Sequence, residues 1–135
     1  MTESIGKIRH PKIVAAEKHV TNMQGAIAST PIIIEYYREN NRVTLSWDNI
    51  LGIPEGGAAT ILLDDPLPDV CKPLGTDVIA PIILQDNSVP VFGSMRIATS
   101  GGISLGITAS PGTNLSGLGN AGIYGGSVTY CVYEA

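Results

Sequence analysis

Two short stretches of the 135-residue chain match patterns that carry chemistry in enzymes. The stretch GISLG, residues 102–106, fits G-x-S-x-G, the strand-to-helix turn that presents a nucleophilic serine in many hydrolases. The stretch GLGNAG, residues 117–122, fits G-x-G-x-x-G, in which a glycine-rich turn opens a helix toward a dinucleotide pyrophosphate. Each pattern needs a strand before it and a helix after it, so the flanking residues test both.

The flanking residues argue against an enzyme site in either place. Residues 103–107 alternate between apolar and small side chains, which places Ser104 within a strand, and TASPGTN after it begins no helix. The histidines, His10 and His19, both lie far upstream, whereas the hydrolase order puts the base downstream of the serine. The second stretch runs into IYGGSVTYCVY, which consists of strand formers. We therefore expect no catalytic residue and no dinucleotide.

The sequence also predicts no metal and no other cofactor. Asp64, Asp65, Asp69 and Asp77 could offer carboxylates to calcium, but they lack a recognisable loop spacing and two prolines stiffen the segment. We interpret this segment as a solvated acidic connection. The two cysteines stand sixty positions apart and form no metal motif. Cys131 lies in an apolar strand and is expected to be buried.

Composition and charge exclude several classes of function. The net charge is −4 and no lysine or arginine cluster is present, so the chain lacks the electrostatic footprint of nucleic-acid binding. The first residues show no signal peptide, and no apolar run approaches the ~20 residues of a membrane helix. We expect synthesis in a host cytoplasm without membrane insertion. Charged residues make up only 15% of the chain, which predicts a surface partly covered by copies of itself or by a partner.

Most of the chain reads as short strands separated by turn residues, which predicts an all-β antiparallel sandwich or jelly roll. Val43, Leu45 and Trp47 alternate with polar residues, the pattern of a half-buried strand with Trp47 inside. Pro81 and Pro90 predict that their strands are edges or start at a bulge. The expected strands cover residues 31–38, 42–50, 59–63, 76–84, 89–99, 102–108 and 125–134.

The first thirty residues differ from the rest. Within residues 11–24, four apolar residues recur at helical spacing, Pro11 suits a first helical turn and Gly25 suits a C-terminal cap. A strand through the same segment is the alternative. We favour a helix in an N-terminal arm, residues 1–30, ahead of a head domain, residues 31–135.

Three stretches, taken in order, resemble a known group of proteins. They are YYRENNRVTLSW (36–47), LPDVCKPLGTDVIAPIILQDNSVPVFGSMRIATSGGISLGI (67–107) and the terminal GGSVTYCVYEA (125–135). Together they resemble the C-terminal head domains of phage tail and head fibres and of similar viral surface proteins. Those heads are compact β-sandwiches, related in shape to the jelly rolls of tumour necrosis factor and C1q, and they usually form trimers.

The resemblance implies a non-enzymatic, trimeric protein on a virion surface. Fibre heads follow a long stalk, whereas about thirty residues precede the expected sandwich here. We therefore expect residues 1–30 to dock on a neighbouring subunit or on another capsid or tail protein. Two roles stay open: capsid decoration, as a minor capsid protein seated on the shell, and host attachment to a surface glycan or protein.

The resemblance also directs attention to two sets of residues. In similar trimers the terminal strand lies near the threefold axis, which points to Val128, Tyr130 and Val132 as the trimer interface. The alternative is an ordinary core position in one monomer.

Binding contacts in such heads lie on loops, and the longest turn-rich stretch is 109–126. Asn114, Asn120 and Tyr124 are its candidates for receptor or partner contact, although Tyr124 fits a core position equally well. A soluble carbohydrate-binding β-sandwich is the alternative function, which a low aromatic content of 5% disfavours.

Overall fold

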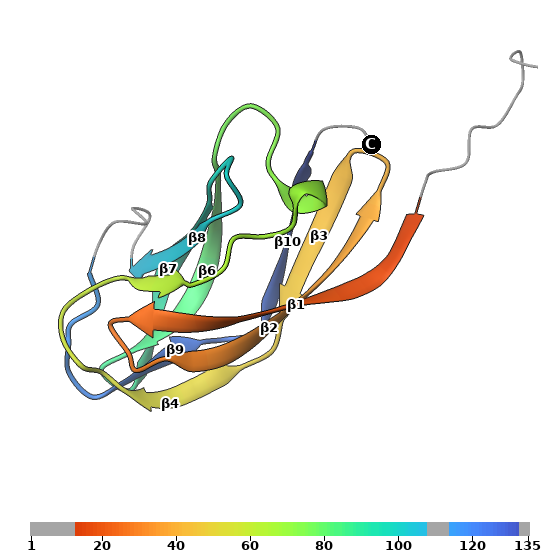
Figure 1. Ribbon diagram of the computed structural model, residues 1–135. Helices are drawn as coiled ribbons and strands as arrows, with labels where there is room; N and C mark the ends of the chain where they lie inside the picture. Colours follow the sequence, from red (N-terminus) through yellow and green to blue (C-terminus); the bar gives the residue numbers. More distant parts are fainter. Residues whose placement is uncertain (1–12, 108–113, 133–135) are drawn as a thin grey trace, which may run out of the picture.

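The computed structural model describes residues 13–107 and 114–132, and these form an all-β antiparallel sheet of ten strands (Figure 1). The predicted all-β class is therefore confirmed. The sheet order is β10-β3-β2-β1-β5-β8-β7-β6-β9-β4. In chain order the elements are β1 (Ile13–Gly25), β2 (Thr30–Glu39), β3 (Arg42–Trp47), β4 (Ile50–Pro54), β5 (Ile61–Leu63), the 3-10 turn η1 (Asp69–Cys71), β6 (Val78–Asp86), β7 (Val89–Ile97), β8 (Ile103–Ile107), β9 (Asn120–Ile123) and β10 (Gly126–Cys131).

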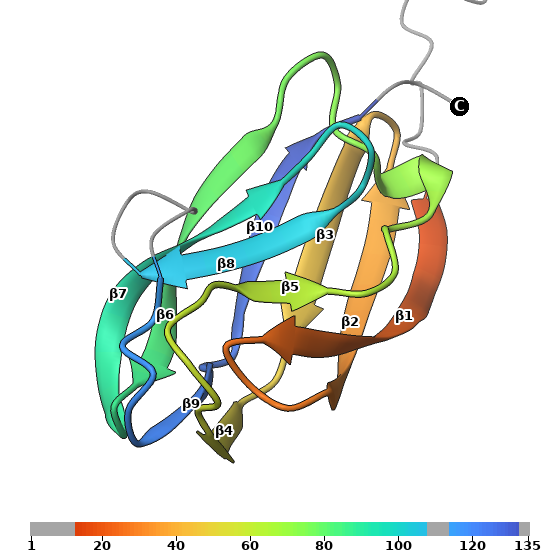
Figure 2. The same cartoon turned by 60° about the vertical axis from the view of Figure 1, so that its left-hand side comes forward.

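The sheet curls until its two ends meet, as a comparison of Figures 1 and 2 shows. β3 leads into β4 and β9 leads into β10 after short interruptions, and the two runs keep one register across them. Trp47 pairs with Gly126, and Ile50 pairs with Ile123. Because β9 also pairs with β6 while β10 pairs with β3, the strands close into a flattened barrel. Closure leaves few free sheet edges in this fold.

The core follows from strict alternation along the strands. On β2, Ile32, Ile34 and Tyr36 point inward, and the residues between them are exposed. Trp47 is buried, as predicted. Each large apolar side chain that is fully buried contributes about 1.5–3 kcal/mol. The largest of these are Met23, Ile34, Val43, Leu45, Ile61, Leu67, Leu84, Met95, Ile97, Leu105, Leu115 and Ile123.

The helix that we favoured within residues 11–24 is wrong, because residues 13–25 form the long strand β1. β1 pairs with β2 on one side and with β5 on the other. Its apolar residues serve opposite faces: Met23 is fully buried, whereas Val20 is 61% exposed. A helix would have brought both side chains to one face, so pairing with two neighbouring strands has overridden the helical spacing.

The position of β1 also bears on the expected arm. Residues 13–25 are an inner strand of the same sheet as the head, so the described part of residues 1–30 is not a separate unit. Residues 1–12 lie outside the described residues. Docking of this segment on a capsid or tail protein therefore stays a prediction.

The connection from β5 to β6 carries η1 against the inner side of β10. The Tyr130 hydroxyl donates to the main-chain oxygen of Cys71 at 2.5 Å, and both residues are buried. Burial raises the pKa of the Cys71 thiol to about 12, so this cysteine stays a neutral core residue. Within residues 13–107 and 114–132, no helix is long and apolar enough to cross a membrane.

Candidate functional site

The residues expected at a trimer interface lie in the interior of the barrel. Tyr130 and Val132 are buried, and Val128 packs partly buried against the same core. Their strand carries Ser127 and Thr129 on its exposed side. The structure therefore places these three side chains in the core of the monomer, which was the alternative that the sequence left open.

Cys131 likewise differs from expectation, because its side chain is exposed. It follows Tyr130 on β10, and successive residues of a strand point to opposite faces. The apolar run around Cys131 therefore predicted the strand correctly but assigned its faces the wrong way round.

The stretch expected to be a long binding loop is only partly a loop. Asn114 is exposed ahead of β9, whereas Asn120 is the first residue of β9 and is partly buried. Tyr124 follows β9, with its N–H donating to the main-chain oxygen of Ile83 at 3.0 Å. Tyr124 is partly buried, between the two alternatives considered for it. The structure therefore does not present the three residues together on one loop tip, since Asn120 and Tyr124 are held by strand β9 and its neighbours.

The described part of this loop, residues 114–119, is tied down by two carboxylates. Asp86 accepts hydrogen bonds from the N–H and the hydroxyl of Ser116, at 3.0 and 2.9 Å. Glu55 accepts from the N–H of Gly117 at 2.7 Å and from the N–H of Asn87 at 3.0 Å. Partial burial, with a smaller effect from the neighbouring Asp86 carboxyl, raises the pKa of Glu55 above its usual value.

Neither enzyme-like pattern opens a helix, as the flanking residues predicted, although the second half of the glycine-rich stretch forms a strand where a loop was expected. Ser104 is a residue of strand β8, paired with Leu62 and with Arg96. The glycine-rich stretch leads into strand β9 rather than a helix. Its glycines serve geometry: Gly119 has φ +64°, and a Cβ on Gly122 would collide with the main-chain oxygen of Ile50 on β4.

A groove opens on the outer surface where β5 and β8 part. These strands are paired at Ile61 with Leu105 and at Leu62 with Ser104, and the pairing ends there. Farther along, the chains meet again through a hydrogen bond of 2.9 Å from Leu67 N–H to Gly101 O. Figure 2 shows β5 lying between β1 and β8 on this side of the barrel. A gap in the ladder, closed at both ends, is thus built into the sheet.

Polar groups of the main chain face this gap. A hydrogen bond from Asp64 N–H to Asn22 O ties residue 64 to β1, so the main-chain groups of Leu63 face β8 instead. On the other side, a hydrogen bond of 2.8 Å from Ala98 N–H to Gly102 O joins the end of β7 to the start of β8, so the groups of Ile103 face β5. The main-chain groups of Leu63 and Ile103 therefore face one another where the pairing ends, and both residues are buried.

The groove has a volume of about 360 Å³ and a mixed lining. Its polar side chains come from three different strands, and Leu62, which is 44% exposed, offers an apolar surface between them. Neither a histidine nor a cysteine lines it, so no general base stands beside Ser104 among these residues. The lining residues are Gln24, Leu62, Leu63, Arg96, Ala98, Gly102, Ile103 and Ser104.

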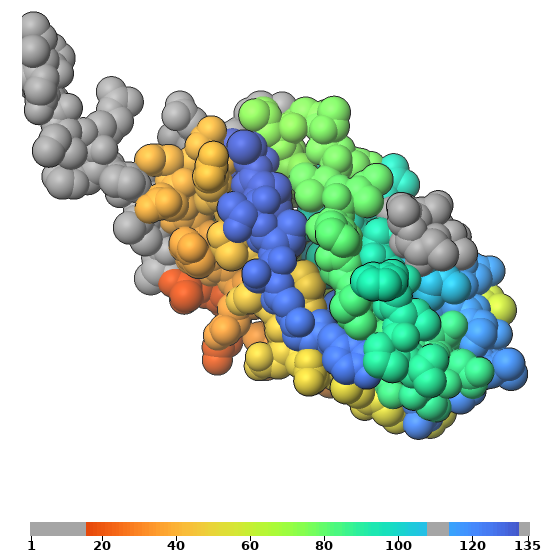
Figure 3. All heavy atoms as spheres, turned by 180° about the vertical axis from the view of Figure 1, so that it is seen from behind, coloured from red at the N-terminus to blue at the C-terminus, as the bar shows by residue number. Residues whose placement is uncertain are grey.

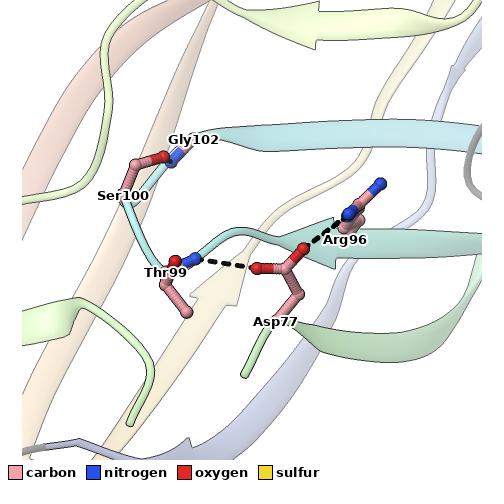
Figure 4. Close-up of polar contacts among 5 residues, drawn as sticks. All are labelled: Asp77, Arg96, Thr99, Ser100 and Gly102. Atoms are coloured by element: carbon pink, nitrogen blue, oxygen red, sulfur yellow. Dashed lines mark hydrogen bonds and ion pairs between the residues drawn. The ribbon is translucent and has the colours of Figure 1, made fainter. Parts of the chain in front are cut away.

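An ion pair orients the one charged group among the lining residues (Figure 4). The Nε and Nη2 groups of Arg96 both donate to Asp77 Oδ2, at 2.8 and 2.6 Å. The other oxygen, Asp77 Oδ1, accepts from the N–H of Thr99 at 3.0 Å. These bonds, that of Arg96 foremost, lower the pKa of Asp77 below its usual value. The Asp77 carboxylate thereby balances the charge of the guanidinium and holds it in place, with further N–H donors left for a ligand.

Arg96 and Gln24 did not stand out in the sequence, and Ser104 and Asp77 did so only for other chemistry. The available signal was weak: Arg96 alternates with buried Met95 and Ile97, which predicts an outward side chain but not a groove. Within the part of the chain that the structure describes, no cluster of three metal-ligating side chains occurs.

Comparison with known proteins bears on the fold. No protein-family model matches the chain, and no curated protein matches its sequence. Among solved structures, the chain is similar to the reovirus attachment protein sigma1, in a crystal structure of its complex with alpha-2,3-sialyllactose. The TM-score is 0.54 and the identity 11%, and the match covers 90% of this chain and 66% of that one. This chain therefore spans just under two thirds of that protein's structure, and the likeness shows a shared fold.

Proposed function

We propose that this chain is a non-enzymatic, trimeric head of a virion surface protein and that it attaches to a glycan on the host surface. The groove between β5 and β8 is the proposed binding site. It carries the proposal because its lining combines what sugar recognition needs: oriented polar groups and a small apolar surface.

The chemistry of the groove suits sugar hydroxyls. A hydroxyl both donates and accepts a hydrogen bond, and Arg96, held in place by Asp77, can donate to it from the groove lining. Gln24 and Ser104 add amide and hydroxyl groups on the neighbouring strands. Because Asp77 balances the charge of Arg96, the site does not demand an anion, yet the guanidinium can still meet a carboxylate.

The shared fold supports the attachment role by analogy. The similar structure is that of a viral attachment protein in complex with alpha-2,3-sialyllactose, so the same fold is used in a viral attachment protein. At 11% identity this likeness transfers no binding residue, so the position of the groove rests on this chain's own geometry.

The proposal is tested by glycan binding of the full chain. Titration with alpha-2,3-sialyllactose and with lactose, followed by saturation-transfer NMR, measures affinity for an acidic and a neutral sugar. We expect saturable binding, and we expect Arg96→Ala to weaken it roughly ten- to hundredfold through loss of a charge-assisted hydrogen bond. Arg42→Ala, on the exposed side of β3, is the matched control and should bind as the wild type.

Two outcomes contradict the proposal. If the chain binds neither sugar, and also binds no glycan on an array of mammalian and bacterial surface glycans, the attachment role is contradicted. Equal binding by wild type and Arg96→Ala removes the groove as its site. A soluble carbohydrate-binding module, the alternative function, would bind in the groove but would remain monomeric.

A further inference from the structure

The outer face of the β6–β7 hairpin is an exposed apolar surface. Phe92 is 82% exposed, and its cross-strand partner Ile83 lies beside it on β6. Figure 3 shows the hairpin, green to teal, open at the surface beside β10 in dark blue. We call this surface the hairpin face, and its exposed apolar members are Pro81, Ile83, Pro90 and Phe92.

The hairpin face is large enough to indicate an interaction surface. An aromatic ring exposed to this degree offers about 150 Å² of apolar surface by itself. Together the four side chains reach the order of a few hundred Å², the size at which an apolar patch marks an interaction site. A standard interface buries about 800 Å² on each partner, so the hairpin face can form its apolar centre.

Charge is absent from the hairpin face. Between Val78 and Met95 the only charged residue is Asp86, whose side chain is buried and bonded to Ser116. Arg96 follows on the same outer side of β7, four residues beyond Phe92, where it is paired with Asp77. The β1–β2 side of the barrel differs, because Lys18 and Glu35 face outward from paired strands there. A copy of this net acidic chain can therefore meet the hairpin face without opposed carboxylates.

We propose that the hairpin face is the contact between subunits and that its occupant is a second copy of this chain. Apolar, charge-free surfaces are typical of permanent homo-oligomers, whereas transient partners meet on more polar surfaces. The same surface carries a projecting ring, Phe92, and a shallow hollow of about 110 Å³ lined by Ile83, Pro90, Val91 and Phe92. A projection and a hollow side by side allow one copy to fit another.

This inference locates the contact of the proposed oligomer, so it rests on that part of the proposed function. It does not depend on the glycan. Phe92 and Arg96 are four residues apart on β7, which corresponds to about 13 Å along a strand. A change at Phe92 therefore leaves the groove intact, and the two sites can be tested separately.

The test is the native mass of the full chain by light scattering at micromolar concentration. We expect a stable multiple of 14.1 kDa for the wild type, with a trimer as the form proposed, and 14.1 kDa for Phe92→Glu. Val20→Glu is the matched control: Val20 is 61% exposed and apolar but lies on β1, outside the hairpin face, so its mass should equal that of the wild type. Circular dichroism and thermal unfolding of each variant establish that it is folded.

Each result decides the matter. A monomeric wild type overturns both this inference and the trimer in the proposed function. An oligomeric wild type that Phe92→Glu leaves intact, or that Val20→Glu dissociates, overturns the inference alone and leaves the proposed function standing. Ile83→Asp gives a second reading should Phe92→Glu fail to fold, with the same two expectations. Loss of sugar binding by Arg96→Ala tests the groove alone and does not affect the conclusion drawn from the native masses.

Discussion

At the scale of single residues, the ion pair of Asp77 with Arg96 links the stability of the fold to the proposed binding site. Asp77 has a lowered pKa in the folded chain, so its charged form stabilises the fold above its ordinary pKa of 3.8. This contribution is lost as the pH falls through the lowered value. The pair is partly exposed, with half of the Arg96 side chain open to solvent, so its effect on stability is small and its effect on the position of Arg96 matters more.

Asp77→Asn should therefore unfold at a lower temperature than the wild type at neutral pH, and the difference should vanish toward pH 2. The asparagine oxygen can still accept from Thr99 N–H, but Arg96 loses its counter-charge. We expect weaker sugar binding than in the wild type at pH 7. Thermal unfolding across pH 2–7 checks the first expectation, and a pH-independent difference would contradict it.

A substitution of Tyr130 tests whether this residue belongs to the core or to a subunit interface. Its hydroxyl donates to a buried main-chain oxygen, so Tyr130→Phe should lower the free energy of unfolding by about 1–3 kcal/mol without changing the native mass. Thr129→Val, on the exposed side of the same strand, should have a smaller effect. Urea unfolding measures the free energy of unfolding of both variants. If Tyr130→Phe dissociated the oligomer, this would contradict the core assignment and indicate that β10 lies at the subunit interface.

At the scale of elements, most strands followed from the sequence because their alternation is regular. The expected strands at 31–38, 76–84 and 89–99 correspond to β2, β6 and β7 within about two residues at each end. The two prolines also indicated where strand pairing is incomplete. β6 pairs with β9 only at Leu84 and Gln85, and β7 pairs with β8 only from Gly93, so Pro81 and Pro90 each lack a ladder partner on one side.

Other elements could not be predicted for physical reasons. β1 carries a helical spacing of apolar residues, and only its two partner strands, distant in sequence, decide its conformation. β9 reads as NAGI, in which Gly122 suggests a turn but in fact allows close approach to β4. The groove depends on where the pairing of β5 and β8 stops, which is a long-range property that neither strand encodes alone.

The loop before β9 makes an element-scale prediction about acidity. The raised pKa of Glu55 means that the folded chain binds its proton more tightly than the unfolded chain. Its contribution to stability is therefore present at pH values below the ordinary 4.5 and is lost as the pH rises through the raised value.

Glu55→Gln removes this titration. The free energy of unfolding of the wild type, relative to that of Glu55→Gln, should therefore decrease as the pH rises from about 4 to about 7. Urea unfolding at several pH values checks this, with Glu39→Gln, on the exposed side of β2, as the control. A wild-type free energy that instead rises with pH relative to the variant would contradict the assignment.

At the scale of the whole molecule, the low charge and the closed sheet both bear on how this chain can associate. A closed sheet has few free edges, so association of this chain must use its faces rather than strand addition. Charged residues amount to 15% of the chain, and the long β6–β7 hairpin contributes almost none to the surface. The composition thus predicted a covered surface, and the structure was needed to find an exposed apolar candidate for it on the hairpin face rather than on β10.

The measurement that tests the account most directly is chemical-shift mapping of the isotope-labelled chain during titration with alpha-2,3-sialyllactose. We expect the main-chain amides of Leu63, Ile103 and Ser104 and the Arg96 side chain to shift saturably, while the amides of Ile83 and Phe92 on the hairpin face do not. Saturable shifts centred on residues 114–124, or no shifts with any glycan tested, would contradict the claim that the groove between β5 and β8 is an attachment site.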